Sequence, residues 1–141
     1  HPPERRAPDM SVAVVHNTAV EGRRALASGL TQARVLGTDL VVLHAFSGSP
    51  DPASEAKESA AVRDAVVAGL AEIGEPDAAW TLLAGQPDPD AVSTLLGLVE
   101  DAKAELLVVG SRHRSAVGKF LMGQSVQRLL LETSIPVLLV K

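Results

Sequence analysis

A cluster of basic residues and glycines in the last third of the chain has the composition of a phosphate-binding loop. Residues 106–126, LLVVGSRHRSAVGKFLMGQSV, run from an apolar segment through a basic, glycine-containing loop into a polar helix start. Backbone amides and positive side chains hold phosphate groups in such loops. The chain has a formal net charge of -4, yet no carboxylate lies between Glu105 and Glu132. The cations of this stretch are Arg112, Arg114, Lys119 and Arg128. We therefore expect an anionic ligand here and interpret the chain as a nucleotide-binding module.

Other kinds of chemistry are poorly represented. The pair Gly118-Lys119 lacks the upstream glycine and the following hydroxyl residue of a P-loop, so a Walker-type ATPase is not predicted. Asp88 and Asp90 lie in a proline-rich turn, where capping of the next helix explains them without a metal ion. The chain has no cysteine, which excludes thiolate metal sites and thiol nucleophiles. We expect a binding protein without catalytic residues.

Three histidines follow or end apolar segments and form no paired metal-ligand motif. They are His16, His44 and His113. For His16 and His44, a structural role with satisfied hydrogen bonds is at least as well supported as a catalytic one, so neither is included in the predicted site.

Several site candidates also have an ordinary structural explanation. Gly110 and Gly123 fit either phosphate approach or tight packing between strand, loop and helix. Asn17, beside Thr18, fits either a ligand contact or a turn and N-cap before a helix. Ser125 fits either a ligand contact or the N-cap of the last helix.

Apolar segments of two kinds alternate along the chain. Short β-branched runs predict strands at 11–16, 39–46, 78–84, 105–110 and 137–141. Helical spacing of apolar residues predicts helices at 20–36, 57–74, 88–103 and 125–132, with a turn-rich loop at 47–54. The strands are continuously apolar, which is typical of a parallel sheet covered by helices on both faces. In such α/β folds the ligand lies beyond the carboxyl ends of the strands, where the strand order reverses.

Length and composition predict one soluble domain. The chain has 141 residues with 46% hydrophobic and 21% charged residues. Its acidic balance argues against nucleic acid as a partner, and no apolar run approaches the roughly 20 residues of a membrane span. We expect a cytoplasmic protein without a membrane partner. Residues 1–9, HPPERRAPD, are interpreted as a disordered tail or a remnant of expression, and residues 10–141 as the domain.

The chain resembles the universal stress protein family over nearly all of residues 10–141. Nucleotide-binding members carry a glycine, two residues, a second glycine, nine residues, then glycine and a hydroxyl residue. This chain has Gly110, His113 at the second glycine position, then nine residues before Gly123, and Gln124 at the hydroxyl position, followed by Ser125. The segments LVVLH at 40–44, LLAGQPDPD at 82–90 and SIPVLLVK at 134–141 also resemble family strands.

The resemblance implies a fold, a ligand and an assembly. The implied fold is a three-layer α/β sandwich of the adenine nucleotide alpha hydrolase-like (Rossmann-like) type, with a five-stranded parallel sheet in the order 3-2-1-4-5. The implied ligand is ATP or another adenine nucleotide, with Mg²⁺ accompanying it, and the implied assembly is a homodimer through the C-terminal strand. The residues that the resemblance assigns to the ligand are Asn17, Ala45, Gly110, Arg112, His113, Gly123, Gln124, Ser125 and Val126.

Departures from the family pattern keep a second function open. Asn17 stands where the family usually has Asp, and it retains hydrogen-bonding capacity without the charge. His113 and Gln124 alter the glycine motif and favour a nucleotide-free dimeric interaction protein of the same family. If His113 blocks one phosphate contact, His113→Gly should tighten ATP binding by about 1 to 2 kcal/mol, which calorimetry would measure. Unchanged or weaker binding would show that the imidazole is irrelevant or helps.

Overall fold

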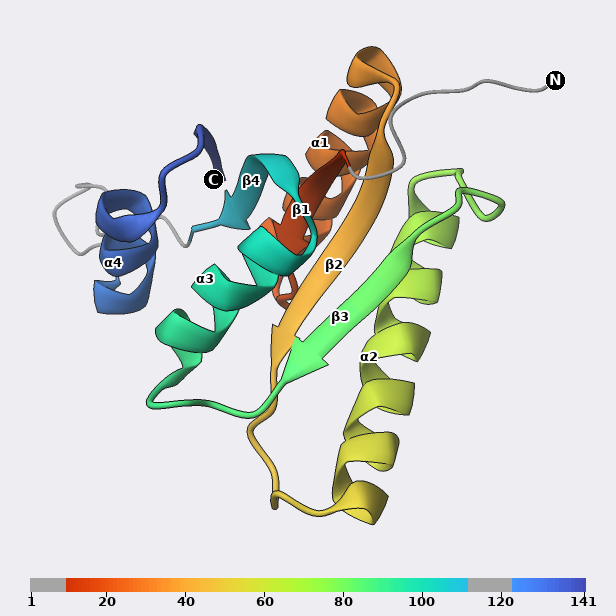
Figure 1. Ribbon diagram of the computed structural model, residues 1–141. Coiled ribbons are helices and arrows are strands. Elements are labelled where there is room, and N and C mark those ends of the chain that lie inside the picture. Colours follow the sequence, from red (N-terminus) through yellow and green to blue (C-terminus); the bar gives the residue numbers. More distant parts are fainter. Residues whose placement is uncertain (1–9, 112–122) are drawn as a thin grey trace, which may run out of the picture.

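The computed structural model describes residues 10–111 and 123–141 of the chain (Figure 1). Five strands and four helices alternate along these residues. The strands are β1 (Ser11–Val15), β2 (Asp39–Ala45), β3 (Thr81–Gly85), β4 (Ala104–Gly110) and β5 (Val137–Val140). The helices are α1 (Val20–Leu36), α2 (Pro52–Glu72), α3 (Ala91–Asp101) and α4 (Gln124–Glu132).

The strands form one parallel sheet in the order β3-β2-β1-β4-β5, which confirms the expected topology. The central strand β1 pairs with β2 on one side and with β4 on the other, for example Val14 with Val42 and with Val108. The strand order therefore reverses between β1 and β4. In a parallel sheet this reversal opens a crevice at the carboxyl ends of the two strands.

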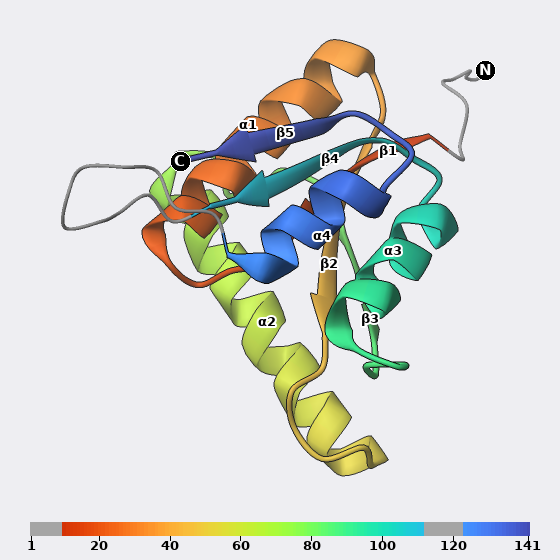
Figure 2. The same ribbon diagram turned by 90° about the vertical axis from the view of Figure 1, so that its left-hand side faces the viewer.

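Alternate residues of the strands point to opposite faces of the sheet and divide the core into two halves. Figures 1 and 2 show the helices that cover the two faces. Val12, Val14 and Val42 belong to the half under α1 and α2. Ala13 and Leu107 belong to the half under α3 and α4. Because both faces are covered, successive strand residues are all apolar, which explains the continuous apolar runs of the sequence.

Helix α2 begins at Pro52, not at Lys57 as the sequence pattern predicted. The side chain of Asp51 accepts a hydrogen bond from the amide of Ser54 at 2.9 Å, and Pro52 occupies the first turn. An aspartate cap followed by proline is a favourable helix start, because proline needs no amide partner there. The predicted turn-rich loop therefore ends at Asp51 and not at Ser54.

Helix α3 confirms the predicted capping role for Asp90 but not for Asp88, and its start differs from the prediction by three residues. The side chain of Asp90 accepts a hydrogen bond from the amide of Ser93 at 2.8 Å, so the helix begins at Ala91 and not at Asp88. Strand β3 likewise begins at Thr81, not at Ala78. Among the described helices, none is long and apolar enough to cross a membrane.

Candidate functional site

A cavity of about 450 Å³ lies where the strand order reverses. Its polar lining comes from residues just beyond β1, from the end of β2 and from the start of α4: His16, Asn17, Thr18, His44 and Ser125. Its apolar lining comes from α3, β4 and α4, with Leu95, Val109, Val126 and Leu129. Volumes of a few hundred Å³ with apolar walls and a few polar groups are typical of small-molecule sites. We call this cavity the crevice.

The crevice brings four of the predicted site residues together. Asn17, Gly110, Ser125 and Val126 line it, although they lie far apart in the sequence. Ala45, Gly123 and Gln124 are not part of its lining, although Ala45 follows His44 and Gln124 precedes Ser125, which both line it. Arg112 and His113 lie outside the described residues, as do Arg114 and Lys119.

Asn17 forms a local turn, which was one of the two roles that its sequence position suggested. Its side-chain oxygen accepts a hydrogen bond from the amide of Ala19 at 2.8 Å, the geometry of an Asx turn. Asn17 is not the N-cap of α1, because Ala19 holds that position without a side-chain hydrogen bond. The side chain is exposed, and its NH₂ group remains the donor that it can offer to a ligand.

The two predicted glycines have different surroundings. A Cβ atom on Gly110 would lie 2.6 Å from the backbone oxygen of Glu21 and 3.1 Å from the amide nitrogen of Gly22, so packing of β4 against α1 alone requires glycine here. A Cβ atom on Gly123 would meet nothing within 4 Å among the described atoms. Tight packing therefore explains Gly110, whereas the described residues give no packing reason for Gly123.

Of the two explanations for Ser125, the capping role is wrong. Helix α4 begins at Gln124, with Gly123 at the N-cap position and no side-chain cap, so Ser125 is the second helical residue. The first amides of a helix lack partners within it and attract negative charge. The start of α4 thus places Ser125 and Val126 on the crevice together with the positive end of a helix dipole.

Arg128 does not line the crevice, although the sequence suggested that the cations of this stretch contact an anionic ligand. Its guanidinium donates to Asp90 Oδ2 at 3.0 Å and to Glu132 Oε2 at 3.0 Å. Hydrogen bonds to Glu132 and Asp90 raise the pKa of Arg128 above its usual value. Arg128 therefore joins α4 to the start of α3, and its charge is balanced by two carboxylates.

Two histidines that the sequence analysis did not include in the predicted site line the crevice in the structure. His16 and His44 both line the crevice, and their ring centroids lie 5.5 Å apart in an edge-to-face arrangement. The signal available in the sequence was their position at the carboxyl ends of β1 and β2. As expected, His44 has a structural partner, because its Nε2 lies 2.5 Å from Glu58 Oε2.

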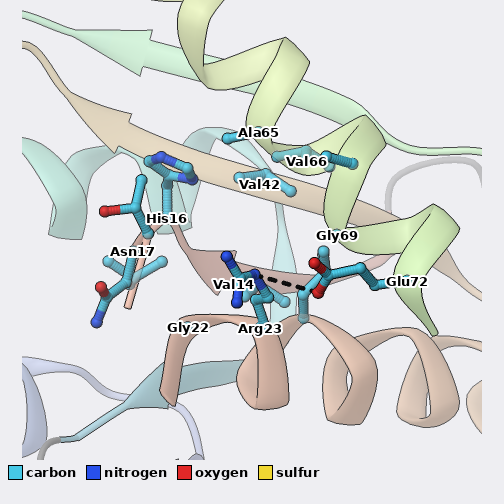
Figure 3. Close-up of a pocket in the computed structure, with 14 residues that line it drawn as sticks. Val14, His16, Asn17, Gly22, Arg23, Val42, Ala65, Val66, Gly69 and Glu72 are labelled. Carbon is cyan, nitrogen blue, oxygen red and sulfur yellow. Dashed lines mark ion pairs between the residues drawn. The ribbon is translucent and has the colours of Figure 1, made fainter. Parts of the chain in front are cut away.

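A second, smaller cavity of about 120 Å³ lies between α1 and α2 (Figure 3). Val14, Val42 and Val66 belong to its lining, and the side chains of Arg23 and Glu72 point toward one another beside it, 3.3 Å apart. Residues 15–18 line both cavities. This short segment after β1 therefore separates the crevice from the α1–α2 cavity.

The sequence pattern of the universal stress protein family matches residues 10–141, which are all but the first nine residues. The chain belongs to this family. A universal stress protein of Mycolicibacterium smegmatis is 40% identical over 121 residues, an alignment that covers 85% of this chain and 88% of the relative.

Solved structures of universal stress proteins share the fold. The Archaeoglobus fulgidus protein in complex with dAMP has a TM-score of 0.72 at 16% identity, covering 94% of this chain and 98% of that chain. A universal stress protein in complex with cAMP has a TM-score of 0.59 at 23% identity, covering 94% of this chain and 96% of that chain. The fold is the adenine nucleotide alpha hydrolase-like, Rossmann-like sandwich that the resemblance implied.

Within residues 10–111 and 123–141, no group of three or more His, Asp or Glu side chains is arranged to hold a metal ion.

Proposed function

We propose that this universal stress protein binds an adenine nucleotide in the crevice and acts as a ligand-dependent module in stress response or signalling, without a catalytic role of its own. The observation that carries the proposal is the convergence of Asn17, Gly110, Ser125 and Val126 on one cavity at the strand reversal. The complexes of two structural neighbours, with dAMP and with cAMP, support adenine as the base.

The residues of the crevice suit the two ends of a nucleotide. The amides at the start of α4, near Ser125 and Val126, would hold a phosphate group, because unpaired amides and the helix dipole favour anions there. Asn17 and the backbone at Ala45 would meet the nucleoside. We include Arg112 and His113 on the phosphate side of the proposal, together with Gly123 and Gln124, the two residues before Ser125.

Two finer elements belong to the same proposal. ATP is the proposed physiological nucleotide, with Mg²⁺ bound through its phosphates. The protein is proposed to form a cytoplasmic homodimer through β5, because this strand is an edge of the sheet and an apolar edge is protected by pairing. Sedimentation of the purified protein would give its subunit number.

Ser125→Glu tests where the phosphate binds. A carboxylate in the first turn of α4 suits the helix dipole, so the free energy of unfolding should not fall, but the same charge should repel a phosphate. We expect calorimetry to show AMP binding weakened by about tenfold, equivalent to about 1.4 kcal/mol, and adenosine binding nearly unchanged.

Ala71→Glu is the matched control, because it adds the same charge at an exposed position of α2 away from the crevice. Equal AMP affinity in wild-type protein and Ser125→Glu would contradict the proposal that the phosphate binds at the start of α4. If acid-released material from wild-type protein held no adenine, and millimolar AMP and ATP gave no heat, the nucleotide-free interaction protein would be the better description.

A further inference from the structure

The crevice contains a pair of imidazoles, His16 and His44, whose rings contact each other. His16 and His44 are neighbours across the paired strands β1 and β2. The amide of His16, just after β1, donates to the backbone oxygen of Leu43 at 2.9 Å. Neighbouring positions of parallel strands direct their side chains to the same face, which accounts for the edge-to-face contact of the two rings.

His44 is held by a carboxylate from α2. Glu58 Oε2 lies 2.5 Å from His44 Nε2, and the two side chains are only 15% and 19% exposed. The same carboxylate accepts hydrogen bonds from the amides of Ser47 at 2.9 Å and Gly48 at 3.0 Å. The hydrogen bond from His44, with smaller help from these amides, lowers the pKa of Glu58. Glu58 is therefore an anion that fixes the orientation of the His44 ring.

Among the described residues, His16 has no such carboxylate partner. Within the part of the chain that the structure describes, its ring contacts His44 and forms no side-chain hydrogen bond. Burial, and secondly the neighbouring His44, lower the pKa of His16 below its ordinary value of 6.5. Apart from His44 with Glu58, the charged groups of the described residues that line a cavity with His16 are Arg23 of α1 and Glu72 of α2. At neutral pH, His16 therefore offers the crevice one donor and one acceptor without charge.

We propose that His16 contacts the nucleoside part of the ligand as a neutral imidazole, and that the His44–Glu58 pair positions it. A donor and an acceptor without charge match the hydroxyl groups of ribose and the edge of adenine, whereas a phosphate is better matched by the start of α4. This inference rests on the proposed function, and it adds a specificity residue and a positioning pair to it.

Adenosine is the probe that tests the contact, because it has no phosphate that titrates near pH 6. We expect His16→Leu to weaken adenosine binding about tenfold at pH 7.5, since it removes one hydrogen-bonding group. His16→Asn keeps a donor and an acceptor and should lose less than about threefold. Wild-type binding should stay constant from pH 8 to pH 6.5 and weaken below, where the ring becomes protonated.

The positioning role has a readout that needs no ligand. In His44→Gln, the electrostatic effect by which His44 lowers the pKa of His16 is lost, and the Glu58 carboxylate is left without its imidazole partner, so both changes favour protonated His16. We expect the NMR titration of the His16 ring to move to higher pH, and the weakening of adenosine binding to move with it. Lys103→Gln, which removes a cation at the opposite end of the sheet, is the control and should move neither.

The outcomes separate this inference from the proposed function. If wild-type protein binds adenosine and His16→Leu binds it with equal affinity, the inference is overturned and the proposed nucleotide site is unaffected. A His16 titration that stays or moves to lower pH in His44→Gln would overturn the positioning role. Absence of binding of both adenosine and AMP by wild-type protein would overturn the proposed function and the nucleoside contact together.

Discussion

Gly110→Ala is expected to lower the free energy of unfolding by about 2 to 3 kcal/mol, at the upper end of the range for overpacked sites. The new Cβ atom would lie 2.6 Å from the backbone oxygen of Glu21 and 2.8 Å from its carbonyl carbon. Backbone atoms cannot move aside by rotation of a side chain, so β4 and the first turn of α1 must separate. Urea unfolding of the ligand-free variant would measure the loss.

Gly97→Ala is the matched control for this substitution. Gly97 lies inside α3, and a Cβ atom there would meet nothing within 4 Å among the described atoms. Because alanine favours the helix over glycine, this variant should gain up to about 1 kcal/mol. If Gly110→Ala were as stable as wild-type protein but bound AMP poorly, the glycine would serve the ligand and not the packing.

Leu107→Ala is expected to cost about 2 to 5 kcal/mol of the free energy of unfolding, the range for truncating a large aliphatic side chain in a core. Leu107 is fully buried in β4, in the half of the core under α3 and α4. Few neighbours can move to fill the cavity, because β4 pairs with β1 on one side and with β5 on the other.

Leu131→Ala is the control for lost leucine contacts in general. This leucine lies on α4 and is 83% exposed, so its truncation should change the free energy of unfolding by less than about 0.5 kcal/mol. Equal losses in the two variants, measured by the same urea titration, would contradict the placement of Leu107 in the core.

The fold was readable from the sequence because its signals are local. Continuous apolar runs such as 39–46 mark strands that are buried on both faces, and the regular alternation with helices leaves few topologies. The start of α2 was missed although Asp51 and Pro52 are a good capping pair, because the neighbouring serines and prolines suggested a loop.

The site was readable only in part because its decisive contacts are not local. Asn17, Gly110 and Ser125 could be chosen from strand ends and a glycine motif. The pairing of His44 with Glu58, however, joins β2 to the first half of α2, and that of Arg128 with Asp90 joins α4 to the turn before α3. Neither pair has a signature in sequence spacing. The carboxylate partner of His44 and the carboxylates that balance the charge of Arg128 could therefore be identified only from the structure.

The central position of β1 has a consequence for synthesis of the protein on the ribosome. Strands β1, β2 and β3 are consecutive neighbours and can associate while the chain is still growing, but the other edge of β1 waits for a partner that begins at Ala104. Contacts between such distant segments form late, because closing a long loop costs entropy before it is rewarded. A nascent chain should therefore acquire its binding pocket last, after translation has passed residue 129.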